Sequence, residues 1–440
     1  MKSKSAITLD LLRRFESQNV TFIDPDGSGP IVWERARGVH VWDADGKRYL
    51  DLTAAFGVAA AGHANPRVVQ AGKQQMAKLL HAMGDVHPHA VKAELARELS
   101  RLTFERWTGG SGRPRGSRIH GKSIFCNSGF EAVEAALKTA LLATGRRGVI
   151  AFCGGYHGLG YGALNATHRG HFRAPFQSQL GRFGRFVEFP TRERHLKGVA
   201  ESIRQLMRDE PVGAILVEPI QGRGGINIPP QQFLPMLRRL CDQHQCLLIV
   251  DEVYTGFGRT GEWFACEHTE VVPDLVCLGK ALTGGFPLSA CVGRADLMDG
   301  AWPRSGGEAI HTSTFLGHPV GCAMALAQIR EIQVGKLVAR SARLGRLLLD
   351  GLRGIEMTKG LRVEVRGVGL MAGIEIRQKT AHPAAVATLQ VITQMLRRGF
   401  ILLPEGEHSN VVSFSPPLTI SETQLHRTVD ALNNVFKEIH

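Results

Sequence analysis

The chain has 440 residues, of which 43% are hydrophobic and 21% are charged, and this balance excludes wholesale disorder and leaves room for a sizeable core. The formal net charge of +13 raises the question of an acidic partner. However, the basic residues are scattered and no basic run carries interleaved aromatic side chains, so we expect no nucleic-acid binding. No window approaches the roughly 18 uninterrupted apolar residues of a membrane-spanning helix, so we expect no membrane association.

The N-terminal apolar stretch is broken at Asp10 and is too short for the hydrophobic region of a signal peptide. The eight cysteines form no C-x-x-C pair, and most of them lie in apolar, strand-like runs. This usage is typical of free, buried thiols in a reducing compartment rather than of a disulfide framework or a zinc site. The expected location is therefore cytoplasmic.

Residues 31–63 contain short strand-like pieces with a turn at Asp45-Gly46, which predicts a hairpin. From about residue 123 the pattern becomes an alternation of strands and helices. The predicted strands are apolar runs at 123–126, 213–217, 247–250, 275–278 and 289–292, and the predicted helices include 130–143 and 233–243. Apolar strands that alternate with helices predict an α/β fold whose mainly parallel sheet is covered on both faces.

The last third of the chain has a different order of elements. It contains predicted helices at 319–332 and 337–351, strands at 361–365 and 370–376, a helix at 384–396, a strand at 411–414 and a closing helix from Ser421. This order predicts a smaller α+β domain. We expect a large domain over residues 63–325 and a small domain over 326–440, which the N-terminal segment 1–62 joins.

Three polar features each follow a buried strand, and ligands of open parallel sheets bind outside the carboxyl ends of the strands. The first feature is Asn127-Ser128-Gly129-Phe130-Glu131, where a strand gives way to a helix. Ser128 and Glu131 fit a capping box. The free N–H groups at this helix N-terminus would also suit a phosphate, and the residues alone allow either role.

The second feature, Asp251-Glu252, places carboxylates at the mouth of a hydrophobic strand, where they could cap a turn or bind a protonated ring nitrogen. The third is Lys280, at the end of another such strand and followed by Thr283-Gly284-Gly285. A lysine there either forms a structural ion pair or has a lowered pKa and serves as an amine nucleophile. A phosphate cradle, a carboxylate and such a lysine are together the parts that pyridoxal 5′-phosphate (PLP) requires.

Longer motifs make a resemblance explicit. Over nearly its whole length the chain resembles the class III (ornithine/4-aminobutyrate type) aminotransferases, which are fold-type-I PLP-dependent transferases. The motifs that carry the resemblance include VWDADGKRYLDL, FCNSGFEAVEAALK, LVEPIQGRGG, LLIVDEVYTGFGRTG, PDLVCLGKALTGGFP, HTSTFLGHPVGC and SFSPPLTI. The resemblance implies a large domain with a mainly parallel sheet, a small α+β domain, PLP as the cofactor and a homodimer with shared active sites.

The resemblance also implies roles for single residues. Lys280 forms the Schiff base with PLP, and Asp251 pairs with the pyridine nitrogen. The other implied cofactor contacts are Ser128, Gly129 and Phe130 at the phosphate, Ser313 and Thr314 at the phosphate of the neighbouring subunit, Val253 and Tyr156 on opposite faces of the ring, Tyr254 and His157 beside it, and Glu218 beneath it, where it orients Asp251 or a neighbouring polar group. Phe56 is implied to line the substrate pocket.

One departure from the family pattern bears on the substrate. Glutamate-using members carry Glu where this chain has Arg223, and Arg where it has Ser413. We expect Arg223 to bind a substrate carboxylate from the other side of the pocket, since its fork suits bidentate binding; a structural ion pair is the alternative. Arg259 and Arg366, also in family motifs, are expected to be structural.

Two other patterns suggest different functions. Residues 256–261 match G-x-G-x-x-G, the dinucleotide-binding fingerprint, but no long helix opens after Gly261, so we expect a tight loop rather than an NAD site. His81, Asp85, His87 and His89 could ligate a metal, but Pro88 indicates an extended loop, and we expect no metal site.

The implied reaction is reversible transfer of an amino group between an amino acid or amine donor and a 2-oxo acid, with Lys280 as general base and acid. The same constellation serves amino-acid racemases and epimerases, decarboxylases and aminomutases, and no motif separates them. A racemase or epimerase is therefore the alternative function. A non-catalytic binding protein on this scaffold is disfavoured, because Lys280, Asp251 and the phosphate residues are all retained.

Overall fold

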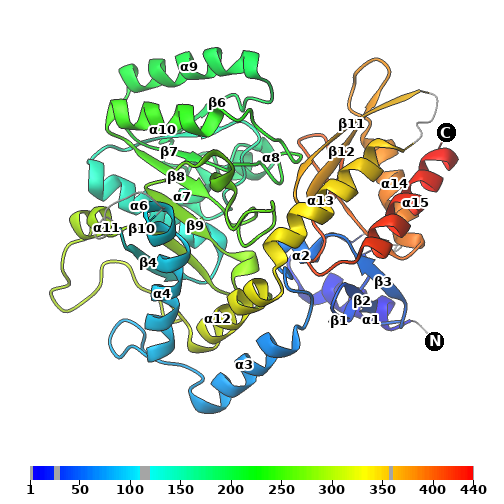
Figure 1. Ribbon diagram of the computed structural model, residues 1–440, viewed down its shortest axis with the longest axis horizontal. Helices are drawn as coiled ribbons and strands as arrows, with labels where there is room; N and C mark the ends of the chain where they lie inside the picture. Colours follow the sequence, from blue (N-terminus) through cyan, green and yellow to red (C-terminus); the bar gives the residue numbers. More distant parts are fainter. Residues whose placement is uncertain (1–2, 24–29, 110–118, 356–359, 440) are drawn as a thin grey trace.

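The computed structural model describes residues 3–23, 30–109, 119–355 and 360–439. A seven-stranded sheet on one side and two four-stranded sheets on the other make up the molecule, and helices α12 (Pro319–Val334) and α13 (Leu337–Arg353) run from the first part to the second (Figure 1). The seven strands are β4 (Gly121–Cys126), β5 (Gly148–Phe152), β6 (Gly184–Val187), β7 (Val212–Val217), β8 (Leu247–Asp251), β9 (Leu275–Leu278) and β10 (Ser289–Arg294).

The large sheet has the order β4-β10-β9-β8-β7-β5-β6, and it is parallel except for β10, which runs antiparallel to both neighbours. Every residue of β7 is buried, because helices cover both faces. Alternate side chains of this strand point to opposite faces, so Ala214 and Leu216 join one core cluster while Ile215 and Val217 join another. This is the doubly covered, mainly parallel sheet predicted from the apolar runs.

Helix α6 (Gly129–Thr144) packs on one face of the large sheet with α11 (Ala295–Ala301). Helices α4 (Ala90–Leu102), α9 (Leu196–Asp209) and α10 (Phe233–His244) pack on the other. Helix α3 (Pro66–Lys78) begins with Pro66 behind an Asn65 cap, a favourable helix start, and packs against α12. The predicted helices at 130–143, 233–243 and 319–332 are thus present within two residues at each end.

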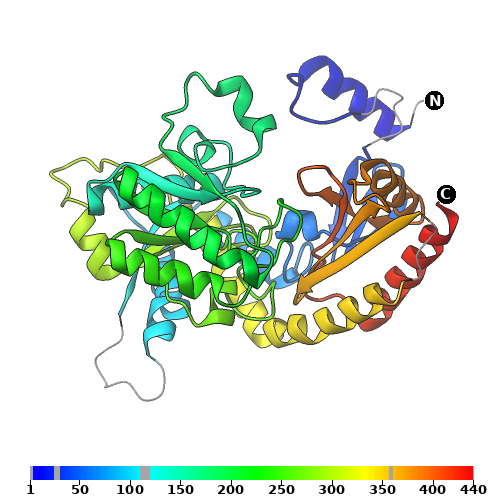
Figure 2. The ribbon, with the colours of Figure 1, turned by 90° about the horizontal axis from the view of Figure 1, so that it is seen from above.

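The first small sheet has the order β11-β12-β15-β14, from strands Leu361–Val368, Met371–Gln378, Val411–Phe414 and Leu403–Glu405. Helices α13, α14 (Ala385–Arg397) and α15 (Glu422–Glu438) pack against it, and α13 and α15 lie along its outer side in Figure 2. Ser421 and Gln424 form a capping box at the start of α15, which is the helix start that the sequence predicts.

The second small sheet has the order β1-β2-β3-β13, from Trp33–Arg37, His40–Asp43, Arg48–Asp51 and Phe400–Ile401. The hairpin predicted at Asp45-Gly46 joins β2 and β3, and Gly46 supplies the positive φ that the turn needs. Because β13 pairs with β3, the N-terminal and C-terminal segments share one sheet. Helix α1 (Lys4–Phe15) meets this sheet at its first residue, where the Lys4 amide donates to Asp45 in the hairpin turn and the Lys4 side chain pairs with Glu34 of β1.

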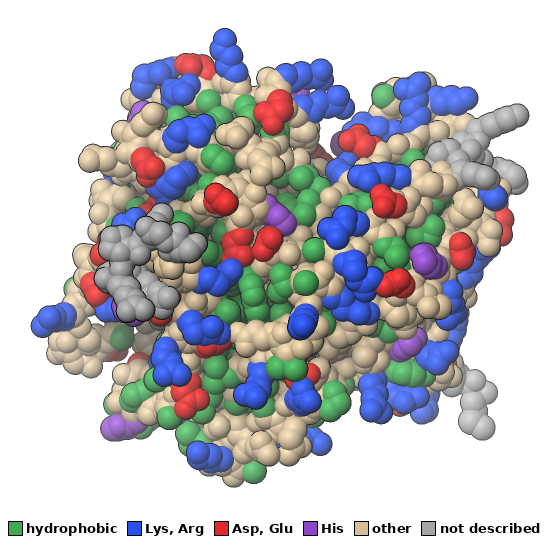
Figure 3. Space-filling view, viewed as in Figure 1, with side chains coloured by type: hydrophobic (Ala, Val, Ile, Leu, Met, Phe, Trp, Pro, Cys, Tyr) green, Lys and Arg blue, Asp and Glu red, His purple; other side chains and the backbone are tan. Residues whose placement is uncertain are grey.

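Lysine and arginine side chains are spread over the face seen in Figure 3 rather than gathered into one patch. No helix in the described part of the chain is long and apolar enough to cross a membrane. The cysteines are free thiols, and all but Cys153 are buried.

Candidate active site

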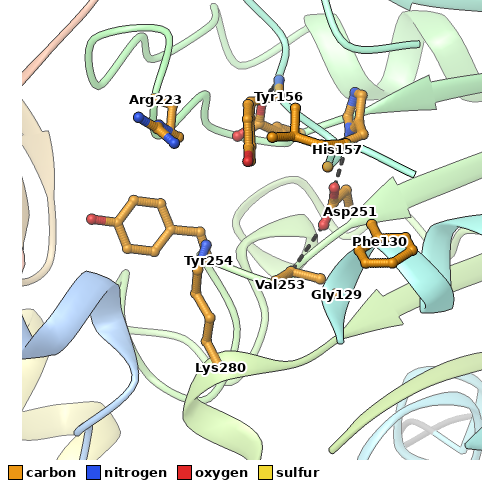
Figure 4. Close-up of a pocket in the computed structure, with 12 residues that line it drawn as sticks. Gly129, Phe130, Tyr156, His157, Arg223, Asp251, Val253, Tyr254 and Lys280 are labelled. Atoms are coloured by element: carbon orange, nitrogen blue, oxygen red, sulfur yellow. Dashed lines mark hydrogen bonds and ion pairs between the residues drawn. The ribbon is translucent and has the colours of Figure 1, made fainter. Parts of the chain in front are cut away.

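A cavity of about 410 Å³ lies where strands β4, β5, β7, β8 and β9 end (Figure 4). Its volume suits a ligand of cofactor size. The cavity is lined by Gly129, Phe130, Tyr156, His157, Gly158, Leu159, Glu218, Arg223, Asp251, Val253, Tyr254 and Lys280. Nine of these are residues for which the sequence predicts a cofactor role, and Arg223 is the predicted substrate residue. The carboxyl ends of the parallel strands therefore bring most of the predicted site together.

Asp251 is the last residue of β8, and its carboxylate is buried at the cavity wall. Its Oδ1 accepts a hydrogen bond from the Val253 amide at 3.0 Å, and its Oδ2 lies 2.8 Å from Nδ1 of His157. His157 is itself fixed, because its backbone amide donates to the hydroxyl of Thr167. The pairing with His157 holds the carboxylate in one orientation, and the sequence gives no sign of this contact.

The neighbouring carboxylate points away from the cavity. Glu252 is fully buried, and it accepts hydrogen bonds from the Cys266 amide and the Thr255 hydroxyl. Burial raises its pKa from 4.5 to about 7. Of the Asp251-Glu252 pair, only Asp251 belongs to the site.

This raised pKa makes Glu252 a source of pH-dependent stability. The folded protein holds the proton more tightly than the unfolded chain, so stability falls as pH rises from about 4.5 to about 7. Above about pH 7 the free energy of unfolding is lower than below about pH 4.5 by on the order of 3 kcal/mol, since each pKa unit is worth about 1.4 kcal/mol. We expect Glu252→Gln to raise the thermal midpoint at pH 8 and to change it far less at pH 5. An equal change at both pH values would refute this account.

Glu218 follows β7, and its carboxylate accepts hydrogen bonds from the amides of Tyr156 and Gly222, at 2.9 and 3.0 Å. Burial raises its pKa above the ordinary value, and the nearby charge of Asp251 acts in the same direction. Glu218 therefore fixes the backbone of two pocket loops. The sequence suggests that Glu218 orients either Asp251 or a neighbouring polar group. Its hydrogen bonds go to the two neighbouring amides and not to Asp251.

Lys280 follows β9 and points into the cavity from below in Figure 4. Its Nζ lies 4.2 Å from the centre of the Tyr254 ring. Burial lowers the pKa of this amine, while the carboxylates of Asp251 and Glu218 act to raise it. The net lowering favours the neutral, nucleophilic amine, which is one of the two roles that the sequence allows for a lysine at this position.

Tyr254 is locked in place beside Lys280. Its hydroxyl lies 2.9 Å from Oγ of Ser415, which in turn donates to the carbonyl of Thr53. A Cβ on Gly222 would lie 2.1 Å from the ring, and one on Gly57 would lie 2.6 Å from it. Glycine at these two positions therefore lets the backbone close on both sides of the ring.

The start of α6 has the predicted capping box. Glu131 Oε2 accepts from the amides of Asn127 and Ser128, at 2.8 and 2.7 Å, and from the Ser128 hydroxyl at 3.1 Å. Ser128 is thus turned toward Glu131 and does not line the cavity, whereas Gly129 and Phe130 do. The first N–H groups of an α-helix lack acceptors within the helix, so the amides of Gly129 and Phe130 at the start of α6 are suited to an anion.

Three other predicted residues also lie outside the cavity lining. Ser313 and Thr314 are exposed on the segment before α12, and the side chain of Phe56 is 52% exposed. The role that the resemblance implies for Ser313 and Thr314, at the phosphate of a neighbouring subunit, stays a prediction. The backbone of Phe56 lies in the left-handed region, with a φ of 61°, which is strained for a residue with a bulky side chain.

Arg223 lies in the loop after β7 and lines the cavity. Its guanidinium stacks on Tyr156, with 4.8 Å between Cζ and the ring centre, and its Nε lies 3.8 Å from Oε2 of Glu405. By contrast, Arg259 is buried and donates to the carbonyls of Leu370 and Pro416. Arg366 pairs with Glu375 at 2.6 Å, so both of these arginines are structural, as expected.

The two alternative patterns lie outside the cavity lining. Residues 256–261 form turns and are followed by a short 3-10 helix, Ala265–Thr269, rather than a long α-helix. His89 bonds to the carbonyl of Gly317, and Asp85 accepts from the Thr312 hydroxyl. Over the described ranges, no group of three or more His, Cys, Asp or Glu side chains could hold a metal ion.

Comparison with known proteins gives consistent results. A family model described as aminotransferase class-III matches residues 23–436. The chain is 36% identical to 5-aminovalerate aminotransferase DavT of Pseudomonas aeruginosa, covering 94% of this chain and 96% of the relative. It is 34% identical to 4-aminobutyrate aminotransferase GabT of Escherichia coli over the same shares. An amine transaminase structure from an uncultivated Pseudomonas species, in its PLP-bound form, superposes with a TM-score of 0.84 at 28% identity, covering 97% of this chain and 99% of that one.

Proposed function

Because the chain belongs to the class III aminotransferase family of PLP-dependent enzymes, we propose that Lys280 carries PLP as a Schiff base and that Asp251 faces the ring nitrogen. The chain is a PLP-dependent transaminase that moves an amino group between an amino donor and a 2-oxo acid, and it has the predicted fold-type-I architecture. Every relative named above is an aminotransferase, and no observation favours a racemase, a decarboxylase or an aminomutase.

The residues present fit the cofactor. The cavity combines helix N-terminal amides for a phosphate, a buried carboxylate for a protonated ring nitrogen and a buried amine with a lowered pKa. A Cβ at Gly129 would lie 2.9 Å from Val253, so the backbone there leaves room only for a glycine. When bound, PLP supplies an electron sink conjugated to the reacting carbon of the substrate.

Each residue then has a defined task. Asp251, held by His157 and the Val253 amide, keeps a proton on the ring nitrogen. Tyr156 and Val253 wall the ring and exclude water, while Glu218 holds the backbone of Tyr156. Lys280 Nζ accepts the proton from the donor's carbon and returns it as general base and acid. The observation that carries this proposal is the placement of Lys280 and Asp251 in one cavity.

The experiment that tests the activity is a panel of amino donors offered with 2-oxoglutarate and with pyruvate. We expect new amino acid to form from each productive pair. Loss of optical rotation in a single donor without an acceptor would replace the transaminase with a racemase.

We propose that Arg223 binds the carboxylate of the substrate. Its side chain is 34% exposed and lines the cavity, and its guanidinium is supported by aromatic rings rather than by a close ion pair. The relatives are named for 5-aminovalerate and 4-aminobutyrate, which each carry an amine and a carboxylate. A donor of this class would place its amine at Lys280 and its carboxylate at Arg223.

The test of this role is Arg223→Met with a carboxylate-bearing donor. Loss of a charge-assisted bidentate contact should raise KM by about tenfold or more. A donor without a carboxylate serves as the matched control, and its KM should not rise. An unchanged KM for the carboxylate-bearing donor would exclude the role.

We also propose a cytoplasmic homodimer in which Ser313 and Thr314 reach the phosphate of the neighbouring subunit. Large apolar side chains near the cavity and on the segment before α12 are exposed, among them Leu159, Ile310 and Phe315, and a second subunit would cover them. Mixing subunits carrying Lys280→Ala with subunits carrying Ser313→Ala and Thr314→Ala tests the sharing. Heterodimers should regain one intact site and therefore activity. No recovery of activity on mixing would contradict the sharing of residues between subunits.

The domain division at residues 62 and 325 is likewise a proposal, supported by the pairing of β3 with β13.

A further inference from the structure

The ring of Tyr254 turns one of its faces toward the amine of Lys280. The Lys280 Nζ lies over this ring, 4.2 Å from its centre, which is well within the roughly 6 Å reach of a cation–π contact. The backbone of Lys280 is in the left-handed region, with a φ of 42°. Such strain persists where the surrounding structure enforces it, and it is typical of functional sites.

The Tyr254 ring is held on three sides. A Cβ on Gly222 or on Gly57 would collide with it, so the backbone closes on the ring from two directions. Its hydroxyl lies 2.9 Å from Oγ of Ser415, which donates to the carbonyl of Thr53 at 3.1 Å. The ring is therefore a fixed surface rather than a side chain that follows the lysine.

The segment that ends at Gly57 is itself strained and is held by a buried carboxylate. Residues 54–57 all have a positive φ, between 46° and 82°. Asp51, which is fully buried, accepts hydrogen bonds from the amide and hydroxyl of Thr53 and from the Ala55 amide. It also pairs with His63 at 2.7 Å. This network keeps the backbone of Gly57 pressed against the Tyr254 ring.

An aromatic face attracts a cation and gains little from a neutral amine. Lys280 passes between these two forms when its Nζ takes a proton and returns it. Burial lowers the pKa of this amine and so disfavours the ammonium. The charged groups that act on it are Asp251, Glu218 and Glu405, which raise the pKa, and Arg223, which lowers it. The ring supplies a further attraction that needs no charge.

We propose that Tyr254 is a catalytic residue whose ring face stabilises the ammonium of Lys280 after Nζ has accepted the proton from the donor's carbon. In that step the carbon–hydrogen bond breaks and a nitrogen–hydrogen bond forms. The electron pair stays with the substrate, where the electron sink of the cofactor takes it up. The inference rests on the proposed role of Lys280 as general base and acid, and it adds what makes a buried amine basic enough for that role.

The test titrates the Lys280 amine in the full-length protein freed of PLP, apart from any activity. Acetic anhydride labels only the neutral amine, and peptide mass spectrometry of LGKALTGG measures the label at each pH. Tyr254→Leu should lower the midpoint by about one pH unit, the tenfold effect of a desolvated cation–π contact. Tyr254→Met, which also lacks a ring, should give the same fall. Tyr254→Phe keeps the ring face and should titrate like wild type. The matched control is Tyr161→Leu, at a tyrosine that is 51% exposed, and it should change nothing.

Kinetics of the PLP-loaded enzyme give a second measurement. In Tyr254→Leu a weaker base must remove the proton, so kcat should fall by about threefold to tenfold. The isotope effect of a donor deuterated at its reacting carbon should rise, because proton transfer then limits the rate more strongly. Both values should stay near wild type in Tyr254→Phe.

The direction of the titration shift separates this role from a structural one. If the ring only excluded water, its loss would admit water and raise the midpoint. A raised or unchanged midpoint in Tyr254→Leu would therefore overturn the proposal. An equal fall in Tyr254→Phe would assign the effect to the hydroxyl and would overturn it as well. Failure of the proposed function shows elsewhere, as an active Lys280→Ala variant, whatever the titration gives.

Discussion

Replacing Lys280 with alanine is expected to lower transaminase kcat/KM by more than about 10⁴-fold. The variant loses the amine nucleophile and, with it, the general base and acid, and one positioned proton-transfer group alone contributes about 10²–10⁴-fold. Stopped assays of product formation measure the change. The visible absorption of the bound cofactor should shift in the same variant, since its covalent link is gone.

Two controls keep this result specific. Lys280→Arg retains a cation at the site but supplies no nucleophile, so it should be as inactive as the alanine variant. Lys122→Ala removes an exposed lysine that pairs with Asp299 on the surface, and it should retain full activity. Activity of Lys280→Ala within tenfold of wild type would contradict the role given to this residue.

The second large effect is expected for Asp251→Asn. The amide cannot keep a proton on a ring nitrogen, and removal of one electrostatic partner of developing charge costs about 10²–10³-fold in kcat. The loss should appear in kcat rather than in KM, because the contact stabilises the reacting state more than substrate binding. Steady-state kinetics with a saturating acceptor measure the two separately.

The neighbouring residue supplies the matched control. Glu252→Gln changes a carboxyl to an amide one position away, but the Glu252 side chain bonds to Cys266 and Thr255 on the side away from the cavity. We expect its kcat to stay within about twofold of wild type, as for other changes remote from reacting groups. Equal losses in the two variants would show that the strand end, rather than the Asp251 carboxylate, is what matters.

Much of the large domain could be predicted from the sequence because its signals are local. Its buried strands are apolar throughout, and strand 275–278 has the predicted bounds in the structure. The polar residue that ends each strand also marks the site, since parallel strands share one carboxyl edge. The sequence pattern alone therefore suffices to assign Lys280 and Asp251 to one cavity.

The contacts that tune the site could not be predicted, because they join residues far apart in the chain. The His157–Asp251 bond, the Tyr254–Ser415 bond and the Arg223–Glu405 contact each depend on where separate loops meet. Glu405 lies in LLPEGEHSN, which carries no motif that distinguishes it from an exposed acidic residue. Ser128 could be predicted only in part. The sequence predicts its capping box with Glu131, but it allows the Ser128 hydroxyl either to face Glu131 or to bind a phosphate, and the structure has it facing Glu131.

The most direct test of the central claim is to treat the purified enzyme with borohydride and locate the pyridoxyl group by peptide mass spectrometry. Borohydride fixes a Schiff base as a stable amine, so the label reports which lysine carries PLP. The structure predicts the label on Lys280, in the peptide that contains LGKALTGG, and its loss in Lys280→Ala. A label on another lysine, or no label in a protein that binds PLP and is active, would contradict the account.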